Sequence, residues 1–288
     1  MTNLRLNLLV GFTVSIVMAN MAVVCAGAGT VALDVHRDLI YVDGGGASRS
    51  LDLAVPKVPA GKKIPLVVYI HGGGWRNGSK QDVNALPLLR EGMAVASINY
   101  RLTDEARWPA QVNDCKAAIR WLRAHGAQYG IDTSKVGVWG HSAGGHLAAL
   151  LGTSNGVKSL EGNEGITTAS SSVQAVCDWF GPSDLNRIVN TSATAHKVVL
   201  ALFGSDDKAA EKVASPITYV SKLAPPFLII HGDKDDLVPV SQSHWLADAL
   251  KKAGAEVKLR VVPGAGHGTG FSAKDQESMV LFFKKYLL

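Results

Sequence analysis

A serine flanked by glycines is the first group in the chain that could do chemistry. The pentapeptide GHSAG at residues 140–144 has the G-x-S-x-G pattern of a nucleophile elbow. In that motif a sharp turn between a strand and a helix exposes the serine hydroxyl. The apolar run 136–139 precedes it and an apolar helical pattern follows it. We therefore expect Ser142 to be a nucleophile; a glycine turn with an N-capping serine is the alternative.

A glycine-rich segment about 70 residues earlier could supply hydrogen-bond donors. HGGGW at residues 71–75 directly follows the apolar run 64–70. Acyl transfer passes through a tetrahedral intermediate whose oxyanion needs about two or three donors, and backbone N–H groups can provide them. The N–H groups of Gly73, Gly74 and Ala143 are the predicted oxyanion hole.

A serine hydroxyl also needs a general base and a carboxylate that orients the base. In proteins with a nucleophile elbow, the three residues occur along the chain in the order serine, acid, histidine. GAGHG at residues 264–268 makes His267 the predicted base. HGDKDDLVP at residues 231–239 offers Asp233, Asp235 and Asp236 as the acid. Both segments follow strand-like runs, so we expect them to reach the same sheet edge as Ser142.

Together these four motifs resemble the esterase branch of the α/β-hydrolase superfamily that is related to hormone-sensitive lipase. Bacterial feruloyl and acetyl-xylan esterase-like carboxylesterases look most similar. YRL at 100–102, WPAQ at 108–111 and FGPSD at 180–184 also resemble this branch, and the likeness covers about residues 30–288. It implies that the acid is the aspartate four residues before the proline of D-x-x-V-P, which is Asp235. Asp236 ranks second and Asp233 third.

The elements that must position these residues alternate between strand and helix patterns. Apolar runs at 64–70, 93–98, 136–139, 173–177 and 227–230, with an alternating run at 257–262, predict strands. Helix-period segments lie between them. This order predicts a mostly parallel central sheet flanked by helices, the α/β-hydrolase fold.

Three further segments complete the expected architecture. The runs 35–42 and 51–55, joined by DGGG, predict an antiparallel N-terminal hairpin. The polar stretch 153–172 is typical of a mobile surface loop. Residues 183–221 are the candidate for a small lid insertion.

Composition excludes several classes of protein. The chain has 288 residues, of which 47% are hydrophobic and 18% charged, which excludes intrinsic disorder. The net charge of +5 is scattered, so no nucleic-acid partner is expected. No metal-ligand spacing occurs, and we predict neither a metal nor a cofactor. Cys115 and Cys177 are expected to be buried free thiols, with a disulfide between them as the alternative.

The N-terminus has the layout of a secretory signal peptide. Arg5, the apolar stretch 6–24 and the small residues 26–29 predict a signal peptide over residues 1–28, followed by a hydrolase domain over 29–288. An uncleaved anchor helix is the alternative. We expect a secreted or periplasmic protein with no integral membrane domain after cleavage.

The predicted activity is hydrolysis of short-chain or aromatic acyl esters through an acyl-enzyme, with feruloyl or acetyl esters on plant polysaccharide as candidate substrates. Trp75 and Trp179 are tentative substrate-binding residues, with core packing as the alternative. An aryl-formamidase, amidase or peptidase of the same fold is a second hypothesis, and a catalytically inactive hydrolase-like binding protein is a third. His71 and His231, at strand ends, are expected to bond to the backbone.

Overall fold

A nine-stranded sheet forms the centre of the protein in a computed structural model that describes residues 22–25 and 28–288. The strand order is β1-β2-β3-β5-β4-β6-β7-β8-β9. The strands from β5 to β9 are parallel, and β1, β2 and β3 join the edge antiparallel. Their bounds are Ala22–Cys25 (β1), Ala28–Ile40 (β2), Ser50–Pro56 (β3), Ile64–Ile70 (β4), Ala94–Ile98 (β5), Ile131–His141 (β6), Ala175–Trp179 (β7), Phe227–Gly232 (β8) and Val257–Val262 (β9).

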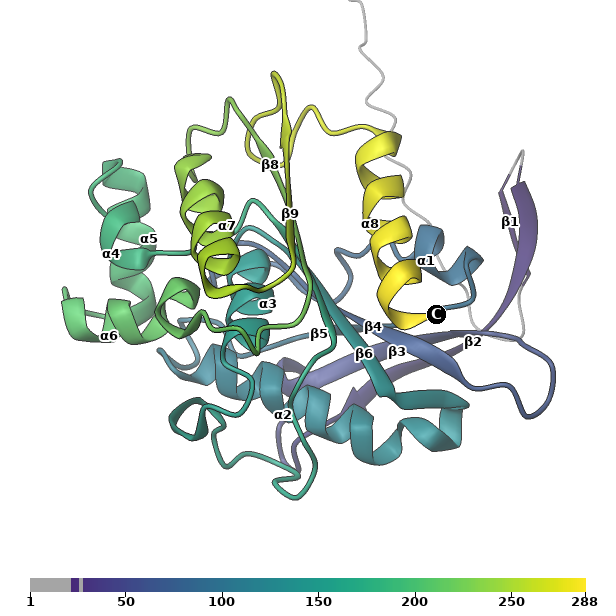
Figure 1. The fold of residues 1–288 in the computed structure, drawn as a ribbon. Coiled ribbons are helices and arrows are strands. Elements are labelled where there is room, and N and C mark those ends of the chain that lie inside the picture. The colour runs from purple at the N-terminus through teal and green to yellow at the C-terminus, as the bar shows by residue number, and fades with distance from the viewer. Residues whose placement is uncertain (1–21, 26–27) are drawn as a thin grey trace, which may run out of the picture.

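Helices cover both faces of the sheet (Figure 1). They are α1 Leu86–Arg90, α2 Ala110–His125, α3 Ala143–Thr153, α4 Leu185–Ile188, α5 Ala193–Phe203, α6 Lys208–Ala214, α7 Ser241–Ala253 and α8 Ala273–Leu287. Side chains of α2, α3 and α7 form one core with Leu66 and Val68 of β4, while α1 and α8 form a second core with Val67 and Tyr69. Successive strand residues point to opposite faces, so a continuous apolar run fills both cores. The predicted α/β-hydrolase architecture is confirmed.

The predicted N-terminal hairpin is present, but its first strand is longer than expected. β2 begins at Ala28 and pairs with β3 on one side and with β1 on the other. Of the predicted signal peptide, the structure describes β1 and Ala28; the other residues of that segment lie outside the described part of the chain. Among the described residues, no helix has both the length and the apolar character needed to cross a membrane.

Cys115 and Cys177 are free and fully buried, as predicted. Cys115 belongs to the core beneath α2, and Cys177 belongs to the core on the opposite face of the sheet. The sheet between the two cores separates the two sulfur atoms, which excludes the disulfide alternative.

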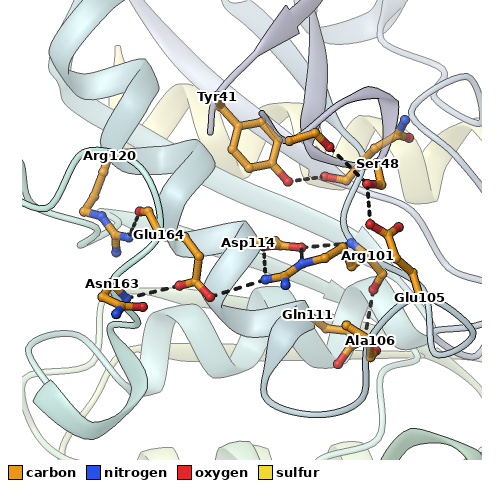
Figure 2. A network of polar contacts seen from close by, with 12 residues as sticks. Tyr41, Ser48, Arg101, Glu105, Ala106, Gln111, Asp114, Arg120, Asn163 and Glu164 are labelled. Atoms are coloured by element: carbon orange, nitrogen blue, oxygen red, sulfur yellow. Dashed lines mark hydrogen bonds and ion pairs between the residues drawn. The ribbon is translucent and has the colours of Figure 1, made fainter. Parts of the chain in front are cut away.

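The segment between α3 and β7, where a mobile surface loop is expected over 153–172, is hydrogen-bonded to α2. Arg120 on α2 is 2% exposed and donates hydrogen bonds of 2.8 Å to the carbonyl oxygens of both Glu161 and Glu164. Figure 2 shows Arg120 beside this loop and, nearby, Glu164 beside the bidentate pair of Arg101 and Asp114. Backbone carbonyls need partners when they leave water. Here α2 supplies partners for two of these carbonyls and ties the irregular segment to the domain.

Residues 183–221, the predicted lid, form the helices α4, α5 and α6 and a short 3₁₀ turn. Leu202, on the buried side of α5, is fully buried, and its carbonyl accepts from the N–H of Trp108 at 3.0 Å. Further along the insertion, the carbonyl of Ala214 accepts from Nε2 of His146 at 2.8 Å. Hydrogen bonds in the middle of the insertion and towards its end thus join it to the body of the domain.

Candidate active site

The turn at Ser142 joins the end of β6 directly to the start of α3. Its backbone has φ 54° and ψ −118°, a conformation that costs a non-glycine residue about 1–3 kcal/mol. The neighbouring backbones approach so closely that a Cβ on Gly140 would lie 2.2 Å from the carbonyl oxygen of Gly144. A Cβ on Gly144 would lie 2.0 Å from the carbonyl oxygen of Ile70. Both glycines of the motif are therefore sterically required.

Three segments far apart in the sequence meet at Ser142. Its Oγ lies 2.9 Å from Nε2 of His267, in the loop after β9. Nδ1 of His267 lies 2.7 Å from Oδ2 of Asp235, in the loop after β8. Because an ionised carboxylate only accepts hydrogen bonds, the proton of a neutral imidazole sits on Nδ1 and leaves Nε2 free to accept from the serine. This is the geometry of a serine nucleophile, a base and an orienting carboxylate.

The other two acidic candidates are not brought to His267. Asp233 and Asp236 are both exposed, whereas Asp235 is 9% exposed. Oδ1 of Asp233 instead accepts from the N–H of Gly264 at 2.7 Å. The structure thus places the first-ranked candidate, and neither of the others, beside the imidazole.

Several donors keep Asp235 ionised. Burial raises the pKa of its carboxyl, but hydrogen bonds from His231, His267 and the N–H of Val238 outweigh burial and hold the pKa well below its usual range. Two backbone N–H groups, of Leu237 and Val238, donate to Oδ1 at 3.0 and 2.8 Å. The carboxylate therefore remains negative and stabilises an imidazolium on His267.

His231 has a part in the site that sequence reasoning missed. As expected it bonds to backbone, through Nε2 to the carbonyl of Val238 at 2.8 Å. The same Nε2 also lies 3.2 Å from Oδ2 of Asp235, and Nδ1 lies 2.7 Å from Oγ of Ser243. The spacing of His231 and Asp235, four residues apart around a turn, is the signal that could have found the contact.

The predicted oxyanion donors border the same cleft as Ser142. Gly73 and Gly74 have positive φ values of 102° and 61°, which turn the chain sharply after β4. No described residue accepts a hydrogen bond from the N–H of either glycine. Ala143 is the first residue of α3, where a backbone N–H has no acceptor within its own helix. All three residues line the cleft, which is consistent with the predicted oxyanion hole.

The cleft over Ser142 has a volume of about 740 Å³ and two different walls. One wall is aliphatic and comes mainly from α4 and α5; the other is aromatic and includes Phe180 and Phe271, whose rings stack at 5.3 Å. Trp75 and Trp179 line the cleft but are only 2% and 4% exposed. They therefore pack in the core and also border the cleft, and their role in substrate binding stays a prediction.

Two further histidines near the serine remain neutral. Burial is the main cause that lowers the pKa of His141 to about 4, and the nearby charge of His267 contributes to the decrease. Burial also lowers the pKa of His146 to about 4. His71 stacks on Tyr100 with ring centroids 4.3 Å apart, and its Nδ1 lies 2.8 Å from the carbonyl of Gly72, as expected.

In the part of the chain that the structure describes, no group of three His, Cys, Asp or Glu side chains could hold a metal ion.

The sequence pattern of one protein family matches residues 51–250, which is more than half of the chain. The chain belongs to the BD-FAE family. This confirms the resemblance to α/β-hydrolase esterases that the motifs indicated.

Relatives of this BD-FAE protein are named as esterases. It is 35% identical over 247 residues to esterase LipQ of Mycobacterium tuberculosis, an alignment that covers 82% of this chain and 58% of LipQ. It is similar to the structure of a truncated carbohydrate esterase from gut microbiota, with 37% identity, a TM-score of 0.80 and coverage of 88% and 95% of the two chains. Thermogutta terrifontis esterase 2, phosphoramylated by tabun, matches with 28% identity, a TM-score of 0.69 and coverage of 88% and 92%. The chain thus spans less than two thirds of LipQ but nearly all of the carbohydrate esterase structure.

Proposed function

We propose that this protein is a secreted serine carboxylesterase that hydrolyses short-chain or aromatic acyl esters, including those borne on plant polysaccharide. The observation that carries the proposal is the chain of contacts from Ser142 through His267 to Asp235, at 2.9 and 2.7 Å, at the floor of a cleft. The esterase names of its relatives support it.

In the proposed mechanism Ser142 attacks the ester carbonyl while His267 accepts the hydroxyl proton. The carbonyl oxygen becomes an oxyanion and accepts from the N–H groups of Gly73, Gly74 and Ala143. The C–O bond to the alcohol then breaks, and His267 protonates the departing oxygen. Water, deprotonated by His267, attacks the acyl-enzyme in the same way and restores Ser142. Asp235 stabilises the imidazolium in both halves and stays ionised.

The chemistry is tested with two reagents. A fluorophosphonate probe is expected to label the wild-type protein and not Ser142→Ala. A panel of p-nitrophenyl esters, acetylated xylan, methyl ferulate and matched anilides measures which bonds are cleaved. Cleavage of anilides or formamides faster than of the matched esters would favour the amidase hypothesis, and labelling of Ser142→Ala would contradict the assignment of the nucleophile.

Secretion is tested on the full chain. The proposal rests on the N-terminal pattern of residues 1–28. Expression with a C-terminal tag in a bacterial host is expected to give mature protein outside the cytoplasm, with an N-terminus after residue 26 or 28. An intact residue 1 in the membrane fraction would support the anchor alternative instead.

A further inference from the structure

The carboxylate of Asp235 is held at both of its oxygens. Oδ1 accepts from the backbone N–H groups of Leu237 and Val238. Oδ2 lies 2.7 Å from Nδ1 of His267 and 3.2 Å from Nε2 of His231. The torsion that turns an aspartate carboxylate has broad energy wells, so the orientation of the group depends on the partners around it. His231 is thus in a position to set the orientation that the base meets.

The tautomer of His231 follows from its neighbours. The carbonyl of Val238, 2.8 Å from Nε2, can only accept a hydrogen bond, so Nε2 must carry a proton. Nδ1 lies 2.7 Å from Oγ of Ser243, whose hydroxyl can donate to it. Nε2–H therefore faces two acceptors, the Val238 carbonyl and Oδ2 of Asp235, and is a donor that they share.

The first turn of α7 fixes His231 from its other side. Ser243 and its neighbour Gln242 are fully buried. Oε1 of Gln242 accepts from the N–H groups of Ser183 and Asp184, each at 2.8 Å, and Oγ of Ser183 donates to the Gln242 carbonyl at 2.6 Å. The ring of His231 thus lies between the carboxylate and a helix start that is hydrogen-bonded to the beginning of the insertion 183–221.

Burial makes the donor from His231 hard to replace. The side chains of His231 and Asp235 are both fully buried. The ring of Phe180 packs against His231 and His267, with centroids 6.3 and 5.0 Å apart. Neither His231 nor Asp235 is among the residues that line the cleft. If Nε2–H were removed, bulk water could not reach Oδ2, and the carboxylate would be free to turn away from His267.

We infer that His231 is a positioning residue for the reaction, whose Nε2–H holds Oδ2 of Asp235 in the orientation that receives Nδ1–H of His267. The inference rests on the proposed esterase function. It gives His231 no contact with the substrate. Loss of the donor should therefore lower kcat and leave KM unchanged, since it weakens an arrangement that matters in the transition state and removes no contact to the bound ester.

The test uses two amides at position 231 that differ in where they can donate. The side-chain nitrogen of glutamine reaches about as far as Nε2 of histidine and keeps the donor to Oδ2, whereas asparagine reaches only about as far as Nδ1 and keeps a partner for Ser243. His231→Asn is expected to lower kcat for p-nitrophenyl acetate about 100-fold, the cost of misplacing a group by about 1 Å. His231→Gln should recover most of this loss, and KM should be the same in both variants and the wild type.

A double-mutant cycle separates positioning from general support of the fold. In the Asp235→Asn background no carboxylate is left to orient, so adding His231→Asn should change kcat little. His244→Asn, at an exposed position next to Ser243, is the matched control and should behave like the wild type. Thermal unfolding checks that each variant is folded. If His231→Asn does not fold, His231→Phe takes its place, because it keeps a ring and has no donor.

Three results would overturn the inference: equal kcat in His231→Asn and His231→Gln, wild-type kcat in folded His231→Asn, or the same fold loss with and without the carboxylate of Asp235. Absence of ester hydrolysis by the wild-type protein would instead overturn the proposed function.

Discussion

The loop at Gly73 and Gly74 in the catalytic cleft and the loop between α3 and β7 are both irregular chain, yet they treat backbone polar groups in opposite ways. In the cleft, the N–H groups of Gly73 and Gly74 have no acceptor among the described residues. In the loop, Arg120 donates to the carbonyls of Glu161 and Glu164, and Arg123 donates to the carbonyl of Ser170 at 2.9 Å (Figure 2 shows the Arg120 side). The first region keeps hydrogen-bonding capacity for a ligand, and the second uses it up inside the protein.

The difference separates two kinds of stabilisation. Unused donors in a preorganised site cost folding free energy and become useful in the transition state of a reaction. The hydrogen-bonded carbonyls of the second loop contribute to folding and have no part in chemistry. Substitutions in the cleft should therefore reduce activity at nearly constant stability. Substitution of Arg120, which binds the loop, should reduce stability at nearly constant activity.

The largest expected effect is that of Ser142→Ala on turnover. Loss of a serine nucleophile typically costs on the order of a million-fold in kcat. The thermal midpoint should change little, because alanine leaves the strained turn as it is and removes only the hydrogen bond between Oγ and His267. Steady-state kinetics on p-nitrophenyl acetate and a melting curve measure both quantities. A variant that keeps a tenth of wild-type kcat would show that Ser142 is not the nucleophile.

Asp235→Asn should lower kcat about 10⁴-fold, because an amide stabilises the wrong imidazole tautomer. The matched control is Asp236→Asn, whose side chain is exposed and adjacent in sequence. It should stay within about twofold of wild type on the same substrate. If Asp236→Asn were the inactive variant, the geometry around His267 would be misassigned.

Arg120→Met tests how far the hydrogen bonds from Arg120 to the loop between α3 and β7 stabilise the protein. Methionine retains the apolar stem but removes the donors to the Glu161 and Glu164 carbonyls, and each unsatisfied buried group costs about 1–3 kcal/mol. We expect the free energy of unfolding to fall by about 3 kcal/mol, with kcat/KM within about twofold of wild type. Urea denaturation and amide hydrogen exchange across residues 158–172 measure the change. Arg90→Met, at an exposed position of α1, is the control; an equal loss there, or a large loss of kcat/KM in Arg120→Met, would erase the contrast between the two regions.

The smallest expected effect is a change in the pH dependence of stability when Asp178, which lies beneath the turn at Ser142, is substituted. Burial raises the pKa of its carboxyl to about 6, against an opposing hydrogen bond from the N–H of Gly181. Because the folded state binds this proton more tightly than the unfolded state, the contribution to stability is present below about pH 4 and is lost as the pH rises through about 6.

Asp178→Asn removes this titration. Between about pH 5 and about pH 7.5, the wild-type protein should lose about 1 kcal/mol more stability than the variant. Urea unfolding of both proteins across that range gives the difference, in which titrations common to both proteins cancel. Parallel pH profiles would mean that Asp178 is already ionised when buried.

Local sequence was sufficient to predict the main strands and to identify the residues found at the site. The apolar runs predicted β4 through β9, with ends that differ by a few residues, because a strand buried on both faces must be apolar throughout. The G-x-S-x-G pattern placed Ser142 at a strand–helix turn because only glycine fits where Gly140 and Gly144 approach other backbone. These features depend on neighbours in the chain, so they could be read from it.

Tertiary structure decided what depends on distant partners. Composition could not show that Arg120 would fasten a polar loop, since the carbonyls it binds lie more than 40 residues away. Nor could spacing show that His231 would reach Oδ2 of Asp235, or that Val198 of an inserted helix would stand against Gly74. Hydrogen bonds and side-chain packing are short-range in space, and only the folded chain determines which residues come within that range.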